Sequence, residues 1–149
     1  MFVVDAFLGN FDRHNGNWGF LYNRVDEQAT IAPVFDCGSC LLPQADERIM
    51  RNILDNEDEL HARIFRFPTS AIKYEDRKIN YYDFLMGTRN TDCIAAVIRM
   101  VPRINLVQIY EFIDGVPYIS EFQKRFYKEY LSARYNLIVR PAYDKMIKQ

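Results

Sequence analysis

The chain has 149 residues, of which 49% are hydrophobic and 15% aromatic, enough apolar material for one substantial core. Its 19 basic and 20 acidic residues give a formal net charge of −1, so overall charge favours neither direct nucleic-acid binding nor a membrane surface. No stretch approaches the roughly 18 consecutive apolar residues of a membrane span. Three cysteines fit a reduced, cytoplasmic protein better than a disulfide framework.

The first part of the chain predicts a helix, a polar loop and a β-hairpin. Residues 2–8 have a helical pattern that ends at Gly9. An apolar helix that starts at the first residue, without a capping residue, is typical of a chain that begins in the middle of a fold. Residues 17–23 and 30–36 are aromatic and β-branched runs around a polar turn, which predicts a hairpin. Pro33 cannot donate to a ladder and favours an edge position in the second strand.

After Pro43 the pattern becomes helical. We expect one or two helices within 45–65 and a loop over 66–78 with a short extended piece at 71–74. Further helices are expected at 81–87 after an Asn80 cap, at 93–101 between Thr91-Asp92 and Pro102, at 105–113, and in a long run opened by Ser120. In that run Phe122, Phe126, Tyr130, Ala133 and Leu137 share one helix face. The expected fold class is α+β, mostly α, in one domain: 1–43 form the loop and hairpin, and 44–149 form a helical subdomain.

Residues 9–19, GNFDRHNGNWG, carry more chemically capable side chains than an ordinary turn. A symmetric hairpin with Asn23 opposite Thr30 would place Asn17 opposite Asp36, with Cβ atoms about 5 Å apart. Asp12 would fold back toward them from the loop. A register slip of one residue would turn one of the partners to the other face.

An amide oxygen and a carboxylate at that spacing suit a hard cation. Mg²⁺ usually takes one or two protein ligands and leaves its other positions to water and substrate phosphates. A further carboxylate can then accept a proton from an attacking hydroxyl. Asp12, Asn17 and Asp36 therefore predict phosphoryl transfer, with Asn17 and Asp36 as metal ligands and Asp12 as the base.

The same residues resemble a known family. DRHNGN, Asp12 to Asn17, is similar to the catalytic loop of protein-kinase-like folds, and DCG, Asp36 to Gly38, resembles their DFG element. Within that superfamily, residues 5–42 most resemble the C-terminal part of HipA-like serine/threonine kinases, and more distantly the phosphatidylinositol 3/4-kinases. By position, the resemblance implies Asp12 as catalytic base, Asn17 and Asp36 as ligands of Mg²⁺ and ATP, and His14 as a loop-organising member of the catalytic set.

The sequence also departs from that family. Such kinases place a Gly-rich phosphate-covering segment and an ATP-clamping lysine upstream of the catalytic loop. Here 11 residues precede Asp12, no G-x-G-x-x-G exists, and the first lysine, Lys73, follows the motif. We therefore expect a kinase-like C-lobe without its N-lobe, inactive or weak alone, which needs that lobe or a partner subunit. The resemblance further implies a protein substrate and a DNA-binding antitoxin as a partner.

Two other functions stay open at this point. The chain is alternatively a non-catalytic binding or regulatory module derived from a kinase, or a phosphatidylinositol-kinase-like fragment. Asp and Asn also cap turns without any catalytic role.

Three further features have competing interpretations. Cys37 and Cys40 form a C-x-x-C, which is typical of redox or zinc sites, but a zinc site would need two more ligands from Cys93, His14 and His61. Arg13 either holds an acid such as Asp12 by a forked hydrogen bond or lies in solvent. The basic excess of residues 121–148 favours a solvated helix face over a site for an acidic partner.

Overall fold

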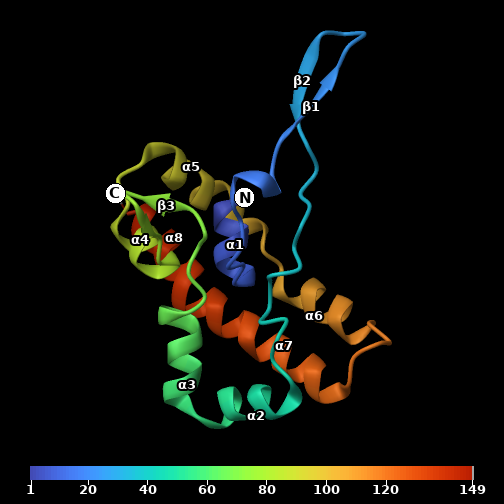
Figure 1. Cartoon of the computed structure of the whole chain (residues 1–149). Helices are drawn as coiled ribbons and strands as arrows, with labels where there is room; N and C mark the ends of the chain where they lie inside the picture. Colours follow the sequence, from blue (N-terminus) through green and yellow to red (C-terminus); the bar gives the residue numbers. More distant parts are fainter. Residues whose placement is uncertain (149) are drawn as a thin grey trace.

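The computed structural model describes residues 1–148 and is mostly helical, with two small antiparallel hairpins. The long helix α7 (Glu121–Arg134) crosses the molecule, and α1 (Phe2–Leu8) packs on it. The hairpin of β1 (Phe20–Asn23) and β2 (Gln28–Ile31) stands away from the helical body (Figure 1). The arrangement confirms the expected helix-rich layout and leaves the loop after α1 at the base of the projecting hairpin.

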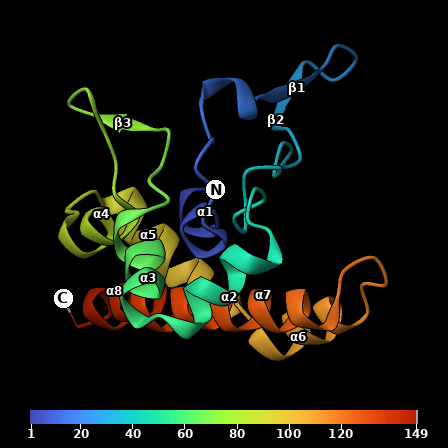
Figure 2. The same cartoon turned by 60° about the horizontal axis from the view of Figure 1, so that its bottom comes forward.

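The other helices pack against α1 and α7 or gather at the end of the molecule that holds the C-terminus (Figure 2). Side-chain caps start most of them: Asn80, Asn90 and Asn105 each accept a hydrogen bond from the backbone N–H three residues on, and Ser120 forms a capping box with Gln123. The predicted cap at Thr91 is therefore one residue late. The bounds are α2 (Glu47–Asp55), α3 (Glu57–His61) with a π-helical turn (Ala62–Arg66), α4 (Tyr81–Gly87), α5 (Thr91–Met100), α6 (Leu106–Asp114) and α8 (Arg140–Met146), the last joined to α7 by a π-helical turn (Tyr135–Val139).

One hydrophobic core joins these helices. Phe126 and Tyr130 of the predicted α7 stripe are fully buried and stack with ring centroids 5.8 Å apart. Helix α1 contributes Val3, Ala6 and Phe7, so the segment that leads into the polar loop is anchored in the core. Other core members come from every large helix: Met50, Ile53, Leu85, Val97, Ile113, Ile138, Val139 and Ala142.

The predicted hairpin register is wrong by two residues. Asn23 pairs with Gln28 and Phe20 with Ile31, so the symmetric pairing of Asn23 with Thr30 does not occur. The cause is a tighter turn: Asn23 accepts a hydrogen bond from the Val25 amide (2.9 Å) and donates to Asp26 (2.6 Å). Beyond the strands, toward the helical body, Ala32 N donates a hydrogen bond to Gly19 O (2.9 Å).

The strands are also shorter than predicted. Asn17 belongs to a 3₁₀ turn, Asn15–Asn17, and Asp36 follows Pro33 outside the ladder. The sheet therefore does not pair Asn17 with Asp36. A second correction concerns the number of hairpins, because β3 (Lys73–Tyr74) and β4 (Arg77–Lys78) form another within the expected loop.

Within residues 1–148 no single helix has the length and apolar character to cross a membrane. Only the pair Thr91–Arg103 and Leu106–Asp114, bent by 60°, reaches that length and composition together.

Candidate functional site

Gly9 ends α1 and sets the direction of the loop that follows. Its φ of 69° is left-handed, and its N–H bonds to Asp5 O as a helix cap. A Cβ on Gly9 would lie 2.8 Å from the hydroxyl of Tyr130, so helix α7 packs directly against this backbone. The predicted helix end at Gly9 is confirmed, and its packing explains why glycine is required.

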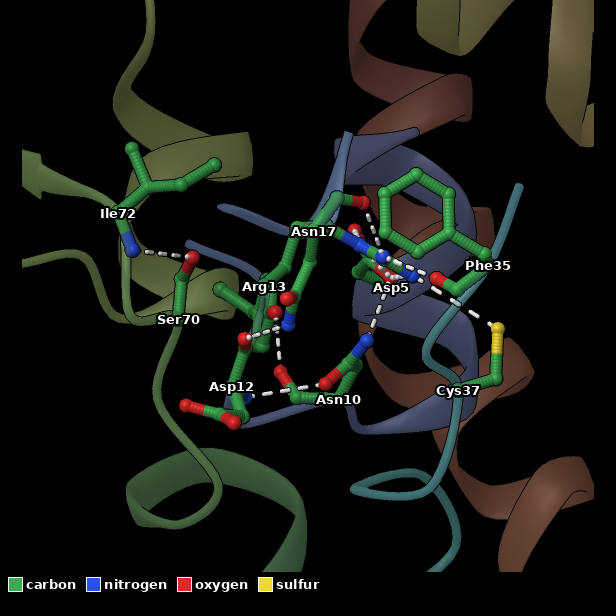
Figure 3. Close-up of polar contacts among 10 residues, drawn as sticks. Asp5, Asn10, Asp12, Arg13, Asn17, Phe35, Cys37, Ser70 and Ile72 are labelled. Carbon is green, nitrogen blue, oxygen red and sulfur yellow. Dashed lines mark hydrogen bonds and ion pairs between the residues drawn. The ribbon is translucent and has the colours of Figure 1, made fainter. Parts of the chain in front are cut away.

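Arg13 is the centre of a buried polar network (Figure 3). The residue is 2% exposed, and its guanidinium binds the carboxylate of Asp5 through Nε and Nη2 at 3.2–3.3 Å. Nη1 donates to the carbonyl oxygens of Asn17 (2.9 Å) and Phe35 (2.7 Å), and Nη2 lies 3.7 Å from Cys37 Sγ. One side chain thus joins helix α1, the loop and the segment after the hairpin.

The electrostatics of Arg13 follow from this arrangement. Burial opposes the charge of the guanidinium, but the hydrogen bonds and ion pair with Asp5 outweigh it, so the pKa of Arg13 is raised. Both members of the pair have side chains only 3% exposed. Of the two interpretations of Arg13, the forked hydrogen bond is correct, but its acid is Asp5 and not Asp12.

The loop itself is tied by short-range hydrogen bonds around Asp12. Asn10 Oδ1 accepts the Asp12 amide (3.0 Å), and Asn17 Nδ2 donates to the Asp12 carbonyl (2.7 Å). The backbone of Asp12 is therefore fixed on both sides, while its carboxylate is exposed and points away from the Arg13 guanidinium in Figure 3. Asn17 is buried, and because its amide nitrogen is engaged, its oxygen is the atom left for a cation.

Asp36 lies between the two residues that Arg13 contacts, Phe35 and Cys37. Its carboxylate is exposed, and its φ of 54° is left-handed, a conformation that Asp and Asn tolerate better than other residues with a Cβ. Arg13 holds the backbone on one side of Asp36 and the thiol on the other. Strand pairing does not bring Asn17 and Asp36 together, but Arg13 bonds both to the Asn17 carbonyl and to the carbonyl that precedes Asp36.

His14 organises the loop. Its Nδ1 accepts a hydrogen bond from Gly16 N (3.0 Å) and so caps the 3₁₀ turn that carries Asn17. The imidazole is exposed. This geometry agrees with the loop-organising role that the sequence suggested for it.

Sequence reasoning missed three buried polar residues that support the loop. Asp5 binds Arg13 and accepts a hydrogen bond from Asn10 Nδ2 (3.0 Å), and Tyr81 donates to the Asn10 carbonyl (2.5 Å). Burial raises the pKa of the Tyr81 phenol, which keeps it a donor. The one available signal was the charge of Asp5 inside an apolar helix.

Arg134 was also misread, as part of a solvated basic face. It is fully buried, and its Nε and Nη2 donate to the Ala6 carbonyl at 2.9 and 2.6 Å. A cation is favourable at a helix C-terminus, where carbonyls lack partners. Most other basic residues of this region are exposed, and several form ion pairs with Glu121, Glu129, Asp114 and Asp144.

The C-x-x-C cysteines lie in a turn closed by Cys40 N bonding to Cys37 O (3.1 Å). Both are free thiols, as is Cys93. Burial, with a smaller effect of Cys37, raises the pKa of Cys40 to about 12. In the part of the chain that the structure describes, no three His, Cys, Asp or Glu side chains are grouped to hold a metal ion. Mg²⁺ needs only one or two protein ligands, so the assignment of Asn17 and Asp36 as its donors stays a prediction.

Comparison with known proteins places this geometry in context. No family model matches the chain. It is 50% identical over 149 residues, 99% of its length, to the serine/threonine-protein kinase CtkA of Helicobacter pylori. The crystal structure of the H. pylori proinflammatory kinase CtkA superposes with a TM-score of 0.96, again at 50% identity over 99% of this chain. The chain covers 46% of the curated CtkA sequence and 54% of the crystallised chain, about half the length of this relative.

Proposed function

We propose that this chain is the catalytic-loop lobe of a HipA-like serine/threonine protein kinase. In this proposal the γ-phosphoryl group of ATP passes to a protein hydroxyl. The observation that carries the proposal is the position of Arg13, whose Nη1 donates both to the Asn17 carbonyl and to the carbonyl that precedes Asp36. The 50% identity to a serine/threonine kinase along nearly the whole chain supports the same activity.

Each site residue has a distinct task in this mechanism. The exposed carboxylate of Asp12, on a backbone held by Asn10 and Asn17, accepts the proton of the acceptor hydroxyl. The Asn17 amide oxygen and the Asp36 carboxylate hold Mg²⁺, for which hard oxygen donors are suited. Bound there, Mg²⁺ would neutralise charge on the transferred phosphate. His14 keeps the loop in shape through its bond to Gly16 and takes no part in proton transfer.

The nucleotide requires a second lobe, which we propose corresponds to the part of CtkA that this chain does not match. In this proposal Asn17 and Asp36 hold the metal, but the sequence has no glycine-rich phosphate loop. The hairpin that would meet such a lobe exposes apolar side chains on both strands: Trp18 just before it, Phe20, Leu21, Tyr22 and Ile31. Exposed apolar clusters of this kind mark interaction surfaces.

The test is phosphoryl transfer after the chain is combined with the unmatched part of CtkA. In the presence of Mg²⁺, ATP radiolabelled on its γ-phosphate should label a serine or threonine of the protein itself or of a protein acceptor. Asp12→Asn and Asp36→Asn should each abolish labelling, whereas Asp26→Asn, at the tip of the hairpin, should leave it unchanged. Labelling that persists in both site variants would disprove the mechanism.

A further inference from the structure

A cavity of about 380 Å³ lies beside the loop and has no task in the mechanism above. Its walls are formed by Phe11, the turn from Leu42 to Ala45, helix α2, Arg63 and Phe67. These walls are mostly apolar, and the volume lies in the range of ligand pockets. Because Phe11 directly precedes Asp12, the cavity adjoins the loop that carries the proposed base.

Arg63 brings a positive charge to this cavity. Within residues 1–148, its Nε is the one buried side-chain nitrogen or oxygen that lacks a hydrogen-bond partner. Glu59 is 4.0 Å from Nη2, at the limit of an ion pair, and the guanidinium is 5.7 Å from the Phe67 ring. The backbone is fixed, because Arg134 donates to the Arg63 carbonyl (3.2 Å). Because Nε itself is covered, a ligand carboxylate would meet the rest of this side chain, which is 33% exposed, and form a charge-assisted hydrogen bond with it.

Another wall of the cavity is a strained turn. Leu41 and Leu42 have φ values of 59° and 55°, a left-handed conformation that is unfavourable for a leucine and persists only where its surroundings enforce it. Leu41 N is held by Leu8 O (3.0 Å), and Ala45 N closes the turn on Leu42 O (2.9 Å). Strained backbone of this kind gathers at ligand sites, which agrees with a binding role for the cavity.

We propose that this cavity binds an apolar side chain of the acceptor protein and that Arg63 binds a neighbouring carboxylate. The inference rests on the proposed function, since the acceptor hydroxyl must reach Asp12. An extended chain advances about 3.3–3.6 Å per residue. In this proposal the bound side chain and the phosphorylated residue belong to one short extended segment, and the cavity selects acceptors that carry an apolar residue beside an acidic one.

Binding is tested with two small probes that need neither ATP nor metal. N-acetyl-L-leucine carries the apolar side chain and a carboxylate, and N-acetyl-L-leucinamide has the same side chain without the charge. Titrated into the ¹⁵N-labelled chain, both should shift the amide signals of Phe11, Ala45 and Phe67. The carboxylate probe should bind about three- to tenfold more tightly, as expected for a charge-assisted bond at a partly exposed arginine.

Two variants and a control decide the result. Arg63→Gln should remove the preference for the carboxylate, and Ala45→Trp, which fills the cavity, should remove binding of both probes. Arg125→Gln, which changes an exposed arginine of α7 outside the cavity, should behave as the unmodified chain. Shifts centred elsewhere, or an unchanged carboxylate preference in Arg63→Gln, would overturn the proposal. The Arg63→Gln result is decisive even if thermal melting shows that Ala45→Trp does not fold.

The same variants separate this proposal from the proposed function. In the active two-lobed protein, Ala45→Trp should raise the KM for a peptide acceptor with a leucine near its serine by about tenfold or more, while ATP hydrolysis is unchanged. Probe binding without any phosphoryl transfer would refute the kinase and retain the cavity. Phosphoryl transfer without probe binding would retain the kinase and refute the cavity as a binding site.

Discussion

At the scale of single residues, the site depends on an arginine whose role only the fold reveals. The sequence singles out Asp12, Asn17 and Asp36 by their spacing, and their roles stay a prediction. It could not assign the partner of Arg13, since Asp5 precedes it in a helix and Phe35 follows a hairpin. Three segments meet at this guanidinium through tertiary packing, which no local pattern specifies.

The first residue-scale prediction concerns the buried pair. Arg13→Met should lower the free energy of unfolding by about 3–5 kcal/mol, because it leaves the Asp5 carboxylate buried without a partner. In the double variant Asp5→Leu/Arg13→Met, that unpaired charge is absent. The double variant should therefore be less destabilised than the sum of the two single variants by at least about 1 kcal/mol. Urea unfolding measures the free energy of unfolding of the two single variants and the double variant. If the two single effects simply added up in the double variant, the assigned pair would be contradicted.

The second prediction separates backbone from charge at Asp36. Asparagine tolerates a left-handed φ, so Asp36→Asn should keep the free energy of unfolding within about 0.5 kcal/mol. Asp36→Ala should cost about 1 kcal/mol more, because alanine is strained at a φ of 54°. Both variants should lose Mg²⁺ affinity by on the order of 100-fold. Chemical denaturation and isothermal calorimetry with Mg²⁺ give these quantities, and a stable, Mg²⁺-binding Asp36→Ala would be inconsistent with the account.

At the scale of elements, local signals located most helices, and long-range contacts decided the rest. Gly9, Asn80 and Ser120 mark helix ends by local chemistry and were predicted from it. The hairpin register was not, because the Asn23 side chain closes the turn two residues earlier than symmetry suggests. Arg134 was misread because its partner, the Ala6 carbonyl, lies 128 residues away in sequence.

The element-scale prediction concerns the junction of α1 and the loop. Gly9→Ala should lower the free energy of unfolding by about 1–2 kcal/mol from its left-handed backbone alone, and further because the new methyl group meets the Tyr130 hydroxyl. Gly87→Ala is the matched control, since a Cβ there meets nothing within 4 Å. Thermal unfolding of the two variants should separate them clearly. Equal melting temperatures would contradict the packing described for Gly9.

At the scale of the whole molecule, the packing of the helical core does not account for the projecting hairpin. Its four-residue strands are exposed on both faces and contribute nothing to the core. We predict that Phe20→Ser with Ile31→Ser, a cross-strand pair 63% and 68% exposed, changes the free energy of unfolding by less than about 0.5 kcal/mol. The same double variant should weaken association with the unmatched part of CtkA by about tenfold or more. Unaltered association, measured by calorimetry, would show that the hairpin is not the contact.

The central claim is that Asn17 and Asp36 hold one divalent cation at the base of the hairpin. Paramagnetic Mn²⁺, titrated into the ¹⁵N-labelled chain, tests it without any need for catalysis. The account predicts that amide signals of Asn17, Asp36 and Cys37 broaden first, that excess Mg²⁺ restores them, and that Asp36→Asn removes the effect. Broadening that begins at other acidic residues, or that survives in Asp36→Asn, would contradict it.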